Sequence, residues 1–220
     1  MRRRLSIYYK LLIILSTAIG ISLNIFKTTS TMAMLSYYTM LSNLICFVSY
    51  SIFLILDIRE KEYKNKIYYI LKGAIIMAIF LTAVVYRVGL MPNHFQMDLL
   101  KNTISNTDIA NKLVHTVSPI LVILEYFLFE KKGNFKMHYP IYWLIIPSFY
   151  VIYVYIYAKL GGRFFNIGGS EKFAYFFLDY ESIGVMNVAK WIMLIMFFMI
   201  SMSYILIYID CKIGKKRTRR

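Results

Sequence analysis

The sequence predicts an all-α, polytopic integral membrane protein whose six helices form a transmembrane bundle. The chain of 220 residues is 59% hydrophobic and 17% aromatic, and no soluble fold of this size can bury that much apolar surface. Its long apolar stretches are continuous and lack the alternation of barrel strands, so helices are the expected spanning form. Short clusters of charged residues separate these stretches, as is typical of the loops of membrane proteins.

Six stretches are long enough, at about 1.5 Å per residue, to cross roughly 30 Å of hydrocarbon. We predict one domain over 1–220, with a basic tail over 210–220 and spans over about 5–26, 34–56, 67–91, 109–129, 141–157 and 185–209. The first stretch resembles a signal peptide but lacks a clear small-x-small cleavage site, so we interpret it as an uncleaved span. Lys72 and Arg87 lie near the ends of the third span, where long basic side chains can reach the interface.

The basic residues predict the orientation of the chain. With six spans, both termini lie on one side of the membrane. The loops and chain ends on that side carry far more lysine and arginine than those on the other side, and Lys10 is counted among these residues. This excess predicts that both termini are cytoplasmic. The Ile-, Lys-, Asn- and Tyr-rich composition indicates a bacterium, and hence the plasma membrane.

Composition also excludes several functions. The net charge of +15 does not indicate nucleic-acid binding, because the charges lie between apolar runs and not in a globular or basic-helix segment. Cys46 lies in an apolar run and Cys211 in the basic tail, so neither a structural disulfide nor a metal site is expected. We expect no cofactor, and membrane lipids are the expected partners.

Polar residues recur at helical spacing in the second span. Ser36, Thr39, Asn43, Cys46 and Tyr50 follow steps of three and four residues, which places them on one helix face directed into the bundle. The simplest interpretation is hydrogen bonding to a neighbouring helix, worth about 0.6–2 kcal/mol for each bond.

A second polar face lies in the fourth span, where His115, Ser118, Val122 and Glu125 share helical spacing. An ionisable residue inside a span is costly and is a functional-site candidate by default. Glu125 is expected to make a buried hydrogen bond or ion pair near the inner side, or to belong to a proton or ion pathway. Pro119 frees the His115 carbonyl of its helical donor and is expected to kink the helix.

Thr39 and His115 lie at one predicted depth. Each is about five or six residues inside a span that starts outside, roughly 7–9 Å below the outer boundary. A neutral imidazole can take the proton of a threonine hydroxyl, so the pair can open an ester by acyl transfer, with Asn43 or a backbone N–H as candidate oxyanion donor. Asp179 either caps its loop or orients His115 if that loop folds back. Arg87 is either a cation that reaches the interface or the partner of a carboxylate headgroup at this depth.

These residues carry a resemblance to known membrane proteins. The stretch HTVSPILVILE, 115–125, resembles the His-Thr, Pro and Glu pattern of the androgen-induced and androgen-dependent TFPI-regulating proteins, and Asn111 fits as well. The stretch YYTMLSNL, 37–44, resembles that family's threonine-bearing span and the FTxxSNL stretch of the bacterial Pr-six-Pr proteins. YFFLDYESIG, 175–184, and PIYWLIIPSFYVIY, 140–153, are similar to the family's last outer loop and fifth span. Pro119 stands one residue closer to the histidine than in the animal proteins, and Phe176 replaces the loop proline.

The resemblance implies a six-span protein in which a threonine nucleophile and a histidine hydrolyse fatty-acid esters of hydroxy fatty acids. By motif position these residues are Thr39 and His115. We therefore predict an integral-membrane hydrolase of lipid esters whose substrate enters laterally from the outer leaflet. The candidate supporting or substrate-binding residues are Asn43, Asp179, Arg87, Ser118 and Glu125. The alternative is a non-enzymatic multi-pass protein, such as a carrier, a lipid-binding protein or an assembly partner, whose polar faces are packing contacts.

Overall fold

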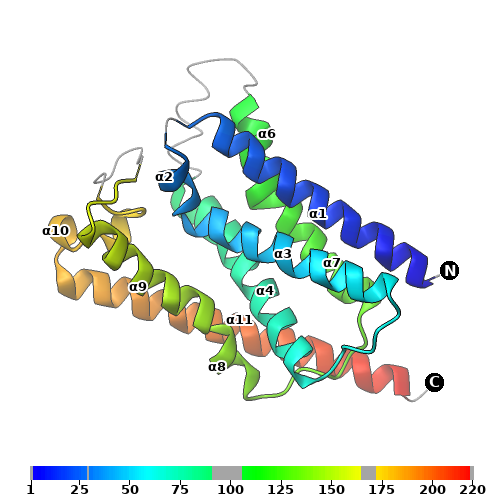
Figure 1. Cartoon of the computed structure of the whole chain (residues 1–220). Helices are drawn as coiled ribbons and strands as arrows, with labels where there is room; N and C mark the ends of the chain where they lie inside the picture. The colour runs from blue at the N-terminus through cyan, green and yellow to red at the C-terminus, as the bar shows by residue number, and fades with distance from the viewer. Residues whose placement is uncertain (1, 29, 91–105, 165–171, 219–220) are drawn as a thin grey trace. The chain divides into compact units, whose positions relative to one another are not determined.

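The computed structural model describes residues 2–28, 30–90, 106–164 and 172–218, and its regular secondary structure in these residues is helical (Figure 1). The α-helices are α1 (Arg2–Phe26), α2 (Thr31–Leu35), α3 (Tyr38–Ile58), α4 (Lys66–Val85), α6 (Asn106–Lys112), α7 (Ser118–Phe129), α8 (Tyr139–Trp143), α9 (Ile145–Lys159), α10 (Tyr180–Ile183) and α11 (Val185–Thr218). Two π-helical segments, η1 (Tyr86–Leu90) and η2 (Leu113–Val117), and one 3-10 turn, η3 (Phe176–Leu178), complete the described elements.

Within the described residues, six helical stretches are long and apolar enough to cross a membrane, which confirms the predicted fold class at this level. They are Arg3–Phe26, Tyr38–Ile58, Lys66–Val88, Ile109–Phe129, Tyr139–Lys159 and Val185–Lys215. They follow the six predicted spans in order. Met91, the predicted end of the third span, lies outside the described residues.

The first helix has buried polar side chains and exposed apolar ones. Lys10 and Thr17 of α1 are fully buried, whereas Leu12, Leu15 and Ile19 are exposed. In water this distribution would be unfavourable, because exposed apolar surface is costly and buried polar groups need partners. Hydrocarbon around the helix would remove the first cost, so this distribution is compatible with a membrane-spanning helix.

The second span starts later than predicted. Met34 and Leu35 belong to the short helix α2, whose N-terminus is capped by Ser30. Ser36 ends α2, where its backbone N–H and its hydroxyl both bond to the Met32 carbonyl. Such local side-chain bonds compete with regular helix, and α3 begins only at Tyr38. Ser36 is therefore not on the α3 face, where the four other predicted residues are buried.

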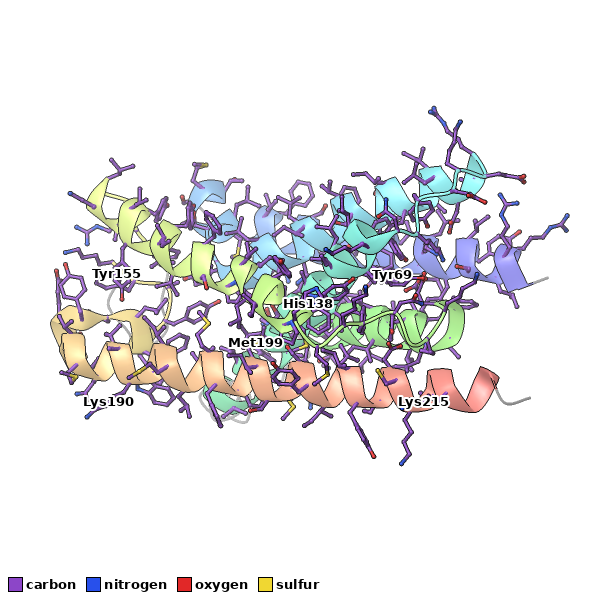
Figure 2. All side chains as sticks on the ribbon, turned by 90° about the horizontal axis from the view of Figure 1, so that it is seen from below. Tyr69, His138, Tyr155, Lys190, Met199 and Lys215 are labelled. Carbon is purple, nitrogen blue, oxygen red and sulfur yellow. The ribbon has the colours of Figure 1, made fainter. Side chains whose placement is uncertain are left out.

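The last helix is longer than predicted. The predicted span ends at 209, but α11 continues to Thr218, so most of the basic tail is helical. At about 1.5 Å per residue its 34 residues reach about 51 Å, well beyond the hydrocarbon thickness of roughly 30 Å. Lys190 and Lys215 extend from α11 near its two ends (Figure 2), which is where charged side chains reach polar surroundings.

The contacts of the chain form two compact units, which are described separately. The first comprises Met1–Thr29, Thr39–Asn65 and Ala78–Glu130, and the second comprises Ser30–Tyr38, Lys66–Met77 and Lys131–Arg220. In the first unit α1 packs along α6, η2 and α7 (Figure 1). In the second unit α11 contacts α8, η3 and α10. All the candidate residues except Asp179 belong to the first unit.

Gly73 of α4 allows a close helix contact within the second unit. A Cβ atom at this position would lie 2.2 Å from the Trp143 ring atoms Cε2 and Cζ2, and the Trp143 side chain is fully buried. The indole ring fills the space that the missing side chain leaves, and in a close-packed interior it has little room to move.

We expect Gly73→Ala to lower the free energy of unfolding by about 1–3 kcal/mol, because the added methyl group overpacks this contact. Chemical denaturation of the purified protein in detergent measures the change. The double variant Gly73→Ala/Trp143→Phe should recover part of the loss, since the smaller ring leaves room for the methyl group. Equal stability of Gly73→Ala and wild type would contradict this close packing.

Candidate functional site

The fourth span contains a π-helical turn next to the predicted histidine. Over Leu113–Val117 the helix widens, and the backbone N–H of Ser118 bonds to the Leu113 carbonyl, five residues earlier. Pro119 has no N–H to donate. In an α-helical turn the Ser118 N–H would bond to the Val114 carbonyl. Here the Ser118 N–H is used elsewhere and Pro119 has none, so neither residue donates to the Val114 carbonyl.

Asn43 of α3 supplies the donor for this carbonyl. Its Nδ2 donates to the Val114 carbonyl at 3.1 Å and to the Thr39 carbonyl at 2.9 Å. Both partners are acceptors, so the amide nitrogen, and not the oxygen, must face them. The fully buried Asn43 thereby joins the turn that carries Thr39 to the turn that carries His115. The side chains of Thr39 and His115 are both buried in this region.

This arrangement affects the predicted role of Asn43. Its two N–H groups are used in structural hydrogen bonds, so in this conformation it has no donor for an oxyanion. Its Oδ1 is buried and accepts no hydrogen bond from the described residues. The group that Asn43 can still offer to a ligand is therefore an acceptor.

Two hydroxyl groups that were not predicted support the Thr39 turn. Ser42 Oγ donates to the Thr39 carbonyl at 3.0 Å and shares a hydrogen bond of 2.7 Å with Thr82 Oγ1 of α4. All three residues are buried. Ser42 lies three residues after Thr39, within reach of its carbonyl, and this spacing is the signal by which the sequence could have indicated it.

The His115 imidazole stacks on the ring of Tyr86. The two ring centroids are 3.9 Å apart and the planes differ by 12°. Tyr86 is the first residue of η1, so two π-helical segments present these stacked rings. Aromatic stacking restrains the plane of the imidazole without using its nitrogen atoms.

Arg87 follows Tyr86 and lies beside the same part of the fourth span. Its Nη2 donates to Thr116 Oγ1 at 3.4 Å, and its side chain is exposed. Thr116 is the residue after His115. The guanidinium group is therefore next to the histidine turn and accessible to a ligand.

Ser118 makes a contact between helices. Its Oγ shares a hydrogen bond of 2.9 Å with Ser16 Oγ of α1, and both residues are buried. Close by, a Cβ atom at Gly20 would lie 2.7 Å from Val114 Cγ1. The small residues of α1 thus let η2 and α7 pack closely, as is common for helices in membranes.

Glu125 and Asp179 have contacts of their own. Glu125, about 15 Å further along the helix than His115, contacts Lys10 and Tyr50. Lys10 was counted with the cytoplasmic charges, but it is buried in α1. Asp179, in the second unit, caps α10: its Oδ1 accepts the backbone N–H groups of Glu181 at 3.1 Å and Ser182 at 3.2 Å.

In the part of the chain that the structure describes, no group of three histidine, cysteine, aspartate or glutamate side chains is placed to hold a metal ion. Comparison of the chain with models of protein families, with curated proteins and with solved structures found no match.

Proposed function

We propose that this protein is a membrane-bound hydrolase of lipid esters, with Thr39 as the nucleophile and His115 as the general base. The observation that carries the proposal is the pair of hydrogen bonds from Asn43 to the Thr39 and Val114 carbonyls. These bonds connect the two turns whose side chains the reaction needs, inside one buried region. The resemblance of both turns to a family of membrane threonine hydrolases supports the same assignment.

The reaction has two steps. His115 takes the proton of the Thr39 hydroxyl while Oγ1 attacks the ester carbonyl, and the alcohol leaves with that proton, which gives an acyl-threonine. Water then attacks the acyl group with His115 again as the base, which releases the fatty acid and restores the hydroxyl. The buried surroundings of Thr39 and His115 favour such chemistry because they strengthen electrostatic stabilisation of the transition state.

The oxyanion needs hydrogen-bond donors other than Asn43. Because α3 begins at Tyr38, Thr39 lies in its first turn, where backbone N–H groups have no acceptor within the helix. These N–H groups also lie at the positive end of the helix dipole. We assign the oxyanion site to the backbone N–H groups of this turn. They are the alternative to Asn43 that the sequence also offered.

Arg87 is the proposed partner for a carboxylate of the substrate. Its exposed guanidinium beside Thr116 can bind a carboxylate with two parallel hydrogen bonds. The positive-inside rule supports cytoplasmic termini in a plasma membrane. In that orientation Thr39, His115 and Arg87 lie near the outer leaflet, from which an amphiphilic ester can enter sideways.

The test is hydrolysis of a fatty-acid ester of a hydroxy fatty acid by the purified full-length protein, together with labelling by a fluorophosphonate probe. We expect both signals to be lost in Thr39→Ala and in His115→Ala, and peptide mass spectrometry to locate the label of the wild type on Thr39. Thr31→Ala and His138→Ala are matched controls at exposed positions and should retain both signals.

Unfolding curves of the four variants show whether each one is folded. Labelling that survives both Thr39→Ala and His115→Ala in folded protein would overturn the proposal. In that case the polar faces would serve packing alone, as in a non-enzymatic membrane protein.

A further inference from the structure

The loop over 131–136, between α7 and α8, is held against the C-terminal part of α11 within the second unit. The backbone N–H of Phe135 donates to Asp210 Oδ2 at 3.1 Å, and both residues are buried. One turn further along α11, a Cβ atom at Gly214 would lie 3.0 Å from the backbone nitrogen of Gly133. The loop backbone can approach the helix because Gly214 has no side chain. The loop therefore lies beside the turn of α11 that runs from Asp210 to Gly214.

Four exposed lysines belong to this end of the second unit. Lys131 and Lys136 are the two ends of the loop, and Lys212 and Lys215 belong to the adjoining turns of α11. Lys215 extends away from the helix (Figure 2). At about 1.5 Å per residue this part of α11 is less than about 10 Å long, so the four lysines start from one narrow layer. We call these four residues the basic belt.

The basic belt lies on more than one side of α11. Lys212 and Lys215 are three residues apart, so they share one helix face. Asp210 and Gly214, which contact the loop, share another face. At about 100° per residue the two faces point in roughly opposite directions. The loop lysines and the helix lysines are therefore at one level of α11 but on different sides of it.

Neighbouring carboxylates do not neutralise the basic belt within its own segments. Over 131–164 and 185–218, the only acidic residue of the sequence is Asp210. Its side chain is fully buried and accepts the Phe135 N–H. Asp210 therefore holds the loop in place from the interior, while the lysines present their charge to the surroundings.

The basic belt follows directly after the apolar part of α11. Tyr208 is 64% exposed, and Lys212 Nζ lies 5.6 Å from the centroid of its ring. A tyrosine and then lysines after a long apolar stretch are typical of the boundary between hydrocarbon and water. Roughly 30 Å of hydrocarbon would cover about 20 residues of α11 from Val185. Tyr208 would then lie at the boundary, and the basic belt among the lipid headgroups.

We propose that the basic belt binds the phosphate groups of anionic phospholipids. A flat lipid surface meets a spanning helix on all sides at one level, which is how these lysines are arranged. A soluble polyanion would contact one side of the helix only. Basic segments next to a membrane span attract anionic lipids, and the flexible stem of lysine lets each ammonium group reach a phosphate. This binding does not depend on the proposed hydrolase activity.

Native mass spectrometry of the full-length protein in detergent tests the proposal. The protein is incubated with an equimolar mixture of phosphatidylglycerol and phosphatidylcholine, and the ratio of the two lipids that remain bound is measured. We expect the wild type to retain mainly phosphatidylglycerol. The belt variant, Lys131→Gln/Lys136→Gln/Lys212→Gln/Lys215→Gln, should lower this ratio about tenfold, because each lysine near the lipid surface contributes to the attraction.

The matched control is Lys27→Gln/Lys61→Gln/Lys159→Gln/Lys190→Gln. It removes the same charge from exposed positions outside the basic belt, and it should keep the wild-type ratio. The proposal is overturned by a wild type that retains both lipids equally, by a belt variant with the wild-type ratio, or by a control with the same loss. A wild type that shows no lipid preference and binds a DNA oligonucleotide would have a soluble polyanion as its partner, which also overturns the proposal.

A measurement on the wild type decides the outcome if the belt variant does not fold. A water-soluble reagent acetylates exposed lysines of the protein in nanodiscs, and peptide mass spectrometry gives the rate at each position. We expect the lysines of the basic belt to react more slowly in phosphatidylglycerol nanodiscs than in phosphatidylcholine nanodiscs. The rates of the four control lysines should change less. Equal rates for the basic belt in the two lipids would overturn the proposal.

Discussion

The Lys10→Met variant is expected to lose about 3–5 kcal/mol of unfolding free energy, which is the cost of leaving a buried charge without its partner. Methionine fills nearly the same space as lysine but removes the ammonium that both Asp57 and Glu125 contact. Two carboxylates would then lie together in the interior of the first unit. Chemical denaturation in detergent measures the loss at neutral pH.

Two further variants separate this effect from a loss of packing. The triple variant Lys10→Met/Asp57→Asn/Glu125→Gln carries none of these three charges, and we expect stability close to that of the wild type. Arg3→Met removes an ion pair whose two side chains are 51% and 72% exposed, so its effect should stay below about 1 kcal/mol. If Lys10→Met were as stable as Arg3→Met, the buried charges would not hold these helices together.

Pro119→Ala is expected to reduce ester hydrolysis on the order of 100-fold, while the free energy of unfolding changes little. Alanine restores an N–H that can bond to the His115 carbonyl, so the π-helical turn at Leu113–Val117 can tighten to α-helix. The change from a π-helical to an α-helical turn shifts the register by one residue, which rotates His115 by about 100° around the helix axis relative to α7. His115 would then leave the Tyr86 ring, and a small misplacement of a catalytic group is enough for a loss of this size.

The rate of chemical modification of His115 measures this rotation independently of enzyme activity. His115 is buried against Tyr86 in the wild type, so diethyl pyrocarbonate should modify it faster in Pro119→Ala. Pro140→Ala is the control, because Pro140 lies in the first turn of α8, where a missing N–H does no harm. Unchanged modification and unchanged hydrolysis in Pro119→Ala would mean that Pro119 does not set the π-helical turn.

Hydropathy predicted the membrane-compatible helices, because lipid requires long apolar segments with internally paired backbones. It did not predict the start of α3, which depends on the hydrogen bonds of Ser36. It also did not predict that Lys10 is buried. A lysine next to three N-terminal arginines has the pattern of a topology signal, and only the positions of Asp57 and Glu125 in space give it another role.

The candidate site was predictable in part. A shared depth of Thr39 and His115 was predicted from helix rise alone, and this depth and the two catalytic roles stay predictions. The structure adds the Asn43 hydrogen bonds that connect their turns. Tyr86 could not be predicted, because the contact with His115 depends on packing between distant segments. The face assigned to His115 and Ser118 assumed 3.6 residues per turn, which the π-helical turn between them does not follow.

The Asn43 amide has a consequence for how this sequence can vary. In water, a carbonyl left without its helical donor would bond to solvent, and a side chain beside it could change freely. Asn43 is fully buried in this protein, so no solvent is present to replace it at the Val114 carbonyl. The need for that donor arises from Pro119 and the wide turn before it. Positions 43 and 119 should therefore change together, although they lie on different helices and far apart in the chain. A relative that loses the proline no longer needs the asparagine. A relative that loses the asparagine should lose the proline as well.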